Sequence, residues 1–166
     1  MSPASIYLAL GSNLGDRADN LRRALRALAP TISVANISPC YETEPAYVLD
    51  QPRFLNLVCS ATTALEPHDV LRRLKTIEAA LGRTAGPRFG PRPVDLDLLF
   101  YDDLILDSPE LTVPHPRIAE RGFVLVPLAD IAPDLLHPVL GVTIAELRDR
   151  LPDAWQGMRR VEDVTL

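Results

Sequence analysis

Residues 94–100 read Val94-Asp95-Leu96-Asp97-Leu98-Leu99-Phe100, an alternation of apolar side chains with two aspartates. Side chains of a β-strand point to its two faces in turn, so this pattern predicts a strand with one face in the core. Asp95 and Asp97 are expected to project together from the other face. The side chains expected in the core are Val94, Leu96, Leu98 and Phe100.

Five elements are predicted before this strand, from runs of strand-forming residues and from apolar residues at helical spacing. They are strands at 5–10, 32–43 (with a break near Pro39) and 53–64, a helix that follows a turn at 11–16 and ends near Ala29, and a helix from Pro67 to Leu81. This order is that of a ferredoxin-like βαββαβ plait, an α+β fold whose antiparallel sheet carries both helices on one face. Loops, a C-terminal extension or a ligand must then cover the other face.

The chain after Phe100 carries weaker patterns. The elements expected there are a short partner for the strand at 104–106, an irregular segment at 109–138 with a helical turn near 117–121, and a helix at 143–151. Thr143 and Glu146 are spaced as the capping box of that last helix. We expect one domain over residues 1–166, with these elements as its C-terminal extension.

Composition excludes several classes of protein. The formal net charge is −5, which argues against a surface built to bind nucleic acid. No apolar run approaches the roughly 20 residues that span a bilayer, and the first residues lack the basic segment of a secretory signal. Cys40 and Cys59 have no CxxC spacing and are expected as free thiols in the core. We therefore expect a cytoplasmic protein without a nucleic-acid or membrane partner. We also expect a monomer.

Charged residues change sign abruptly around position 93. Arg83, Arg88 and Arg92 lie in a loop rich in Gly and Pro, and the strand with Asp95 and Asp97 follows at once. Paired carboxylates suit Mg²⁺, which prefers one or two of them together with phosphate oxygens and water. Arginine holds phosphate oxygens in a planar fork. A solvated loop and a polar strand face are the simpler alternatives, and a magnesium–polyphosphate site is the functional one.

Two aromatic residues are candidates for binding a flat ring. Phe54 and Asn56 share one face of a predicted strand, where a ring can stack a heterocycle and an amide can read its edge. Phe123 is a candidate for a second stacking surface. A core position is the alternative for each phenylalanine. Neither a P-loop nor a GxGxxG pattern is present, so the standard nucleotide motifs lend no support.

A set of short motifs, taken in order, resembles the 6-hydroxymethyl-7,8-dihydropterin pyrophosphokinase family of folate biosynthesis. The matching pieces are Leu10-Gly11-Ser12-Asn13-Leu14-Gly15, Tyr41-Glu42-Thr43-Glu44-Pro45, Asp50-Gln51-Pro52 with Phe54-Leu55-Asn56, Ile77-Glu78, Gly82-Arg83, Gly90-Pro91-Arg92 with Asp95-Leu96-Asp97, Leu111-Thr112-Val113-Pro114-His115 and Arg121-Gly122-Phe123. The resemblance implies a ferredoxin-like fold and transfer of the pyrophosphoryl group of ATP to the pterin hydroxymethyl oxygen, with release of AMP and two Mg²⁺ ions.

The resemblance also implies roles for individual residues. Asp95 and Asp97 would hold both metals, and Arg83 and Arg92 would stabilise the transferred charge. ATP would be contacted by Lys75, Glu78, Arg83, Arg88, Arg92, Leu98, Thr112, His115 and Arg121. The pterin would be contacted by Gly11, Thr43, backbone near Pro45, Phe54, Asn56, Asp95 and Phe123. Departures from the family pattern at Ala85, Phe89 and Pro116 bear on ATP affinity and loop closure.

Two rival functions share this topology. A nucleic-acid-binding plait would present exposed aromatic residues and basic charge on its central strands, whereas here Asp95 and Asp97 stand there. A non-catalytic ligand-sensing domain accounts for the core equally well, but it leaves the aspartates and loop arginines without a task. Both rivals predict that no AMP is released from ATP and the pterin.

Overall fold

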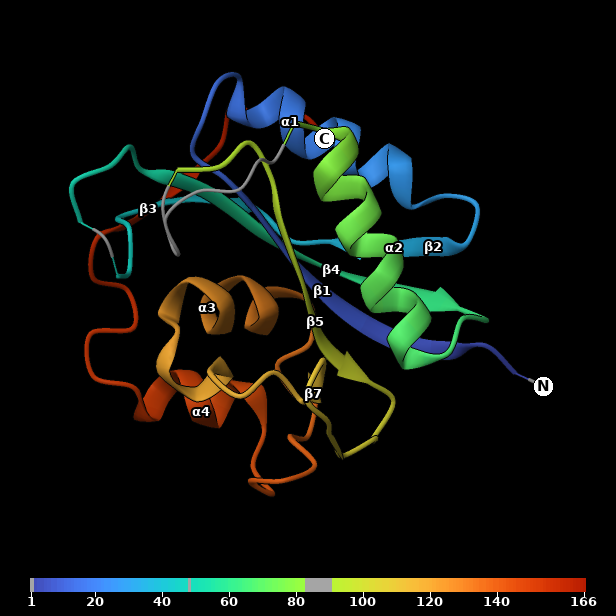
Figure 1. Ribbon diagram of the computed structural model, residues 1–166. Coiled ribbons are helices and arrows are strands. Elements are labelled where there is room, and N and C mark those ends of the chain that lie inside the picture. The colour runs from blue at the N-terminus through green and yellow to red at the C-terminus, as the bar shows by residue number, and fades with distance from the viewer. Residues whose placement is uncertain (1, 48, 83–90) are drawn as a thin grey trace.

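The computed structural model describes residues 2–47, 49–82 and 91–166. Figure 1 shows a twisted central sheet with helices on both of its faces. Within the described residues six strands form this sheet in the order β5 (Asp95–Tyr101), β1 (Ala4–Ser12), β4 (Phe54–Thr63), β3 (Cys40–Thr43) and β8 (Met158–Val161), while β2 (Ile32–Ile37) pairs with the later part of β4. All of these pairs are antiparallel, as predicted.

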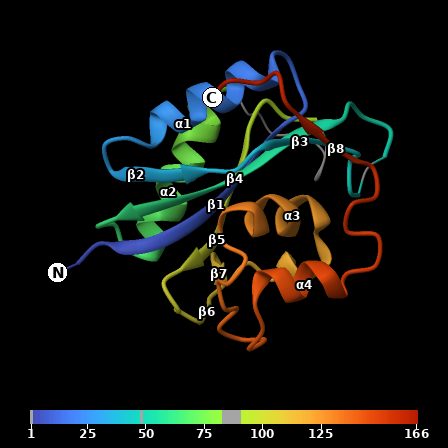
Figure 2. The same ribbon diagram turned by 180° about the vertical axis from the view of Figure 1, so that it is seen from behind.

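The first face of the sheet carries α1 (Arg17–Leu28) and α2 (Pro67–Ala80), which lie side by side in Figures 1 and 2. The Asp16 side chain caps α1 by accepting from the Asp19 amide, and Pro67 suits the first turn of α2. Apolar side chains from both helices and from alternate strand positions form one core. Its buried members include Leu21, Ala24 and Leu28 of α1, Val70, Leu74 and Ile77 of α2, and Ile6, Leu8 and Leu10 of β1.

The second face carries α3 (Gly122–Ile131) and α4 (Ile144–Arg150), and only α4 is predicted by the sequence. The Thr143 hydroxyl accepts from the Glu146 amide, so the predicted capping box is confirmed. The prediction of an irregular chain from 109 to 138 is wrong. It overlooks α3, which is apolar on nearly every side and contains Pro127, so it shows no helical stripe. The helical turn predicted near 117–121 is η1 (Ile118–Glu120).

A β-bulge in β5 overturns the expected direction of Phe100. The register with β1 shifts between Tyr7, which faces Phe100, and Leu8, which faces Leu98. Leu99 is the extra residue, and it turns the next side chain to the opposite face. Phe100 therefore packs edge-on against Tyr7 in the core beneath α3 and α4, instead of joining Leu96 and Leu98 under α1 and α2.

The C-terminal part of the chain adds two pairings that the sequence does not predict. β6 (Leu106–Asp107) pairs with β7 (Thr112–Val113), so the expected pairing of residues 104–106 with β5 is wrong. β8 extends the sheet beyond β3. The chain then runs back to α1, where the Arg22 side chain donates to the Thr165 carbonyl, and Figure 2 shows the terminus there.

Two further expectations concern cysteine and the membrane. Cys40 and Cys59 are free and buried, as predicted, and burial raises the pKa of the first thiol to about 11 and of the second to about 12. In the described part of the chain, every helix is too short or too polar to cross a membrane.

Candidate active site

The site lies on the α3 side of the sheet, where three neighbouring strands present polar or small residues in one row. Gly11 of β1 stands opposite Asn56 on β4 and opposite Asp95 on β5. Residues that face each other in antiparallel strands project to the same side. Asp97 lies one step further along β5, opposite Ala9. The predicted placement of both aspartates on one face is therefore confirmed.

Gly11 has no side chain, so this row of residues forms a flat surface, here named the floor of the site. A Cβ at this position would stand 2.5 Å from Oδ1 of Asn56, so no larger residue fits without displacing the amide. Nδ2 of Asn56 donates to the Thr43 hydroxyl at 2.7 Å, and Thr43 in turn faces Phe54 across the β3–β4 pair. Four residues predicted to contact a pterin are thus brought into one continuous surface.

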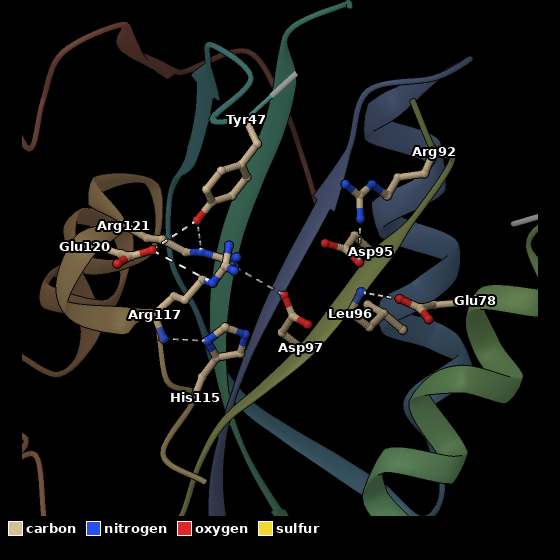
Figure 3. A network of polar contacts seen from close by, with 10 residues as sticks. All are labelled: Tyr47, Glu78, Arg92, Asp95, Leu96, Asp97, His115, Arg117, Glu120 and Arg121. Atoms are coloured by element: carbon tan, nitrogen blue, oxygen red, sulfur yellow. Dashed lines mark hydrogen bonds and ion pairs between the residues drawn. The ribbon is translucent and has the colours of Figure 1, made fainter. Parts of the chain in front are cut away.

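Each aspartate is paired with an arginine. Arg92 lies 3.4 Å from an oxygen of Asp95, and Arg121 lies 3.9 Å from an oxygen of Asp97 (Figure 3). Both guanidinium groups also lie against aromatic rings, with Arg92 5.7 Å from the centre of Phe54 and Arg121 5.5 Å from that of Phe123. The arginine side chains are only 12% and 11% exposed, so water screens their charges weakly.

The two carboxylates repel each other, and both are partly buried. Burial, followed by the charge of Asp95, raises the pKa of Asp97 to about 7, although the Arg121 guanidinium opposes the rise. A cation at this position would relieve the repulsion. Among the described residues no cluster of three or more His, Cys, Asp or Glu side chains forms a closed metal cage. Two carboxylates alone fit Mg²⁺ that completes its coordination with phosphate oxygens and water.

Asn13 positions the segment that carries Arg92. Its side chain is almost fully buried, accepts from the Arg92 amide at 2.8 Å, and donates to Gln51 and to the Pro52 carbonyl. The Asn13 amide also donates to the Arg92 carbonyl. One asparagine therefore joins three loops at the entrance to the strand with the aspartates.

The residues predicted to contact the nucleotide lie around β5, which is an edge strand of the sheet. Glu78 on α2 is buried, accepts from the Leu96 amide at 2.8 Å and lies 3.8 Å from Lys75. Leu98 points into the core beneath α2, away from Asp97. On the other side the His115 amide donates to the Leu99 carbonyl, while Thr112 lies in β7. A molecule reaching all of these must lie along the edge of β5.

His115 is held as a neutral imidazole. Burial, followed by the nearby Arg121 charge, lowers its pKa to about 4. Nδ1 accepts from the Arg117 amide at 3.2 Å, which leaves Nε2 as the protonated ring nitrogen (Figure 3). His115 can therefore donate one hydrogen bond at neutral pH without adding positive charge.

The sequence analysis misses two residues of this network, Tyr47 and Arg117. Tyr47, in the loop after β3, lies with its ring against both Arg117 and Arg121, at 5.1 and 5.4 Å from the two guanidinium carbons. Neither Tyr47 nor Arg117 belongs to a motif, and only folding of the chain brings these two residues together. Four residues named from the sequence, Arg83, Ala85, Arg88 and Phe89, lie outside the described residues. Pro45, also predicted near the pterin, is buried in the segment after β3.

Comparison with known proteins identifies relatives of this chain. The model of the 7,8-dihydro-6-hydroxymethylpterin-pyrophosphokinase (HPPK) family matches residues 7–133. A 2-amino-4-hydroxy-6-hydroxymethyldihydropteridine pyrophosphokinase of Methylorubrum extorquens is 44% identical over 158 residues, covering 94% of this chain and 98% of that protein. A mitochondrial folate synthesis bifunctional protein of Pisum sativum is 52% identical over 127 residues, covering 76% of this chain and 25% of that protein.

Solved structures share the fold. An HPPK-DHPS solved in complex with substrates superposes with a TM-score of 0.80 at 14% identity, covering 96% of this chain and 47% of that one. The chain spans only 20% to 26% of the length of several eukaryotic folate synthesis proteins that it matches. The family match covers most of the chain and all of the described site residues, and the chain belongs to the HPPK family.

Proposed function

We propose that this chain transfers the β,γ-pyrophosphoryl group of ATP to the hydroxymethyl oxygen of 6-hydroxymethyl-7,8-dihydropterin, with release of AMP, in folate biosynthesis. The observation that carries the proposal is the pairing of Asp95 with Arg92 and of Asp97 with Arg121 beside a flat polar floor. Membership of the HPPK family, and similarity over nearly the full length of a pyrophosphokinase, support it. The strand order agrees with a ferredoxin-like plait, which we propose as one pyrophosphokinase domain over residues 1–166.

Asp95 and Asp97 would hold two Mg²⁺ ions together with the oxygens of the triphosphate. Bound there, the metals would neutralise phosphate charge and fix the geometry for in-line attack. The electrostatic repulsion around Asp97 supports this assignment, because a cation removes the cost of keeping its carboxylate ionised. Because the residues that the structure describes form no group of three or more metal-binding side chains here, two carboxylates leave coordination positions for the substrate.

Arg92 and Arg121 would bind phosphate oxygens and stabilise the charge that develops on the transferred group. Their weak exposure makes them effective, since charge–charge attraction grows as water is excluded. Arg83 and Arg88 are proposed to add to this clamp from the preceding loop. Lys75, Glu78, Leu98, Thr112 and His115 are proposed to line the nucleotide along the edge of β5.

The pterin would lie on the floor above Gly11. Phe54 and Phe123 would stack on its two sides, while Asn56, Thr43 and backbone near Pro45 would read its polar edge. Because Nδ2 of Asn56 already donates to Thr43, its Oδ1 is the atom that remains oriented toward Gly11. An acceptor at that position suits the ring N–H and amino groups of a pterin.

Phosphoryl transfer asks the protein for positioning and electrostatics, so no protein nucleophile is required. The pterin hydroxyl is the nucleophile in this proposal. The direct test is to incubate the protein with ATP, Mg²⁺ and 6-hydroxymethyl-7,8-dihydropterin and to measure AMP together with the pterin diphosphate. Asp97→Asn is expected to abolish turnover while the protein remains folded, because the buried face of β5 is unchanged.

The outcome also decides the rival function. Tight pterin binding without AMP release, at any Mg²⁺ concentration, would contradict the enzyme and favour the ligand-sensing alternative. Arg150→Ala is a suitable control, because this arginine is 65% exposed and pairs with Glu146 on the same helix, α4. A cytoplasmic location, a monomeric state and the absence of a nucleic-acid partner stay predictions.

A further inference from the structure

The segment from Leu151 to Val161, here named the C-terminal strap, lies outside the matched family model yet contacts the site from behind. Its first contact is at the start of α3. A Cβ on Gly122 would stand 2.0 Å from the carbonyl oxygen of Ala154, and 2.9 and 3.0 Å from two further backbone atoms. These are backbone atoms, which cannot rotate away. The strap and α3 therefore meet more closely than any residue but glycine allows.

Gly122 stands between two residues of the proposed site. Arg121 precedes it and approaches Asp97, whereas Phe123 follows it and carries the ring that lies against Arg121. A shift of the backbone at Gly122 moves both side chains together. The position of the strap on Gly122 therefore sets where Arg121 and Phe123 lie.

The second contact of the strap is with β3, on the opposite side of the site. β8 pairs with β3, so that Met158 faces Thr43, and the Glu44 amide donates to the Gly157 carbonyl at 3.1 Å. Thr43 in turn accepts from Asn56. The strap is therefore joined by main-chain hydrogen bonds to the strand that supports the polar floor.

Between these contacts the strap is packed into the protein. Ala154 is 7% exposed and shares a small core with Val126 of α3 and with Tyr41 of β3. The Tyr41 hydroxyl donates to Asp130 at the end of α3, and its ring lies 6.0 Å from that of Trp155. α3, the strap and β3 therefore form one packed unit rather than a body with a loose tail.

We propose that the C-terminal strap is a positioning element that fixes the distance between the two sides of the site. One side is Arg121 and Phe123 at the start of α3, and the other is Phe54 with the Thr43–Asn56 pair on the sheet. The proposal rests on the proposed function, in which these two sides enclose the pterin. Stacking between two rings and in-line transfer both require accurate spacing, and a misplacement of about 1 Å can cost about 10²-fold in rate. Support from behind the contacting residues supplies that accuracy.

Gly122→Ala tests the proposal. The added methyl must push the strap from α3, so kcat/KM for the pterin is expected to fall at least about tenfold. Gly141→Ala is the matched control. Gly141 has φ +72, so alanine strains the backbone there too, but nothing lies within 4 Å of the new Cβ. This control is expected to lose stability while kcat/KM stays within twofold of wild type.

Trp155 reports the strap directly, because it is the only tryptophan of the chain and is about half exposed. In Gly122→Ala its fluorescence is expected to be quenched more strongly by acrylamide, since the strap no longer lies flat. Unchanged quenching together with reduced kcat/KM would place the defect within α3 and overturn the proposal. Wild-type kcat/KM in a folded Gly122→Ala protein would overturn it as well.

Two further measurements cover the cases in which Gly122→Ala does not fold or the proposed function is wrong. Should Gly122→Ala fail to fold, Gly157→Ala decides the matter, because its Cβ would stand 2.8 Å from the Glu44 carboxylate and its φ is +69. Reduced kcat/KM with stronger Trp155 quenching supports the strap, and unchanged values overturn it. The wild-type AMP assay is run first. Its failure would refute the proposed function, which separates that result from a failure of the strap alone.

Discussion

Arg121 donates a hydrogen bond from Nε to the Tyr47 hydroxyl oxygen at 3.1 Å, and its NH1 group faces Asp97 (Figure 3). The loop after β3 thereby orients the arginine that directly precedes α3. The same hydroxyl lies 3.4 Å from a Glu120 carboxylate oxygen. Tyr47 therefore fixes which edge of the Arg121 guanidinium faces Asp97, which in the proposed function is the edge offered to a phosphate.

Tyr47→Phe removes this hydrogen bond and retains the ring. A single hydrogen bond to a charged group contributes about 1.5 kcal/mol, so kcat/KM for ATP is expected to fall about tenfold. Steady-state AMP release measures the change. Tyr101→Phe is the control, because its hydroxyl donates to the Leu65 carbonyl away from the site. Equal rates for Tyr47→Phe and wild type would show that Arg121 is oriented without Tyr47.

Asp97→Asn is expected to stabilise the protein when metal is removed with EDTA. Because the pKa of Asp97 is raised to about 7 in the folded state, the native protein favours the protonated carboxyl. That contribution is fully present below the ordinary value of 3.8 and is lost as the pH rises to 7. The stability gain of Asn over Asp should therefore grow between pH 4 and pH 7, as measured by urea unfolding. A gain that shrinks with rising pH would contradict this assignment.

Asn13→Ala should cost about 2 kcal/mol, since it removes one hydrogen bond each from the Arg92 amide, from Gln51 and from the Pro52 carbonyl oxygen. The melting temperature should fall by about 4–8 °C, with ordering of Arg92 lost as well. Thermal unfolding and AMP release are measured together. Asn36→Ala on the exposed face of β2 is the control and should change stability by less than about 0.5 kcal/mol.

Arg92→Ala is expected to lower kcat far more than it changes KM. Its interaction with the phosphate should strengthen as charge develops, so its loss is felt in the transition state rather than in the bound ground state. Initial rates over a range of ATP concentrations separate the two parameters. A variant with raised KM and normal kcat would assign Arg92 to ground-state binding only.

His137, which lies away from the site, is expected to make the stability of the fold sensitive to acid. It is buried, its pKa is lowered by that burial, and its Nδ1 accepts from the amides of Val139 and Leu140. Since the unfolded chain takes up the proton first, stability should decrease as the pH falls below 6.5. His137→Asn should reduce this slope in urea unfolding between pH 6.5 and pH 5.

The sequence predicts the first part of the fold well because its elements have one buried face each. β5 shows both the reach and the limit of such reasoning. Alternation placed Asp95 and Asp97 correctly, but no pattern predicts the extra residue Leu99, which turns Phe100 to the other face. α3 escapes prediction for a related reason. A helix buried on all sides has no polar stripe, and its residues read as an irregular apolar run.

The site residues also differ in how far the sequence predicts them. The sequence predicts Asn56 from its position beside Phe54 on a strand, and it predicts Gly11 and Arg121 as contacting residues through the resemblance to a family. Tyr47 and Ala154 are not predicted, because each acts through a contact between segments that are far apart in the sequence. Contacts of that kind depend on the folded chain and leave no local signal.

The buried cysteines provide a gauge of global unfolding. Thiols react as thiolates, and pKa values of about 11 and 12 leave Cys40 and Cys59 almost entirely protonated at neutral pH. They lie buried on the neighbouring strands β3 and β4, so a reagent such as a maleimide reaches them only after the sheet opens. A cysteine introduced on the surface can therefore be labelled selectively in the native protein. The slow modification of the two natural thiols measures the population of opened molecules.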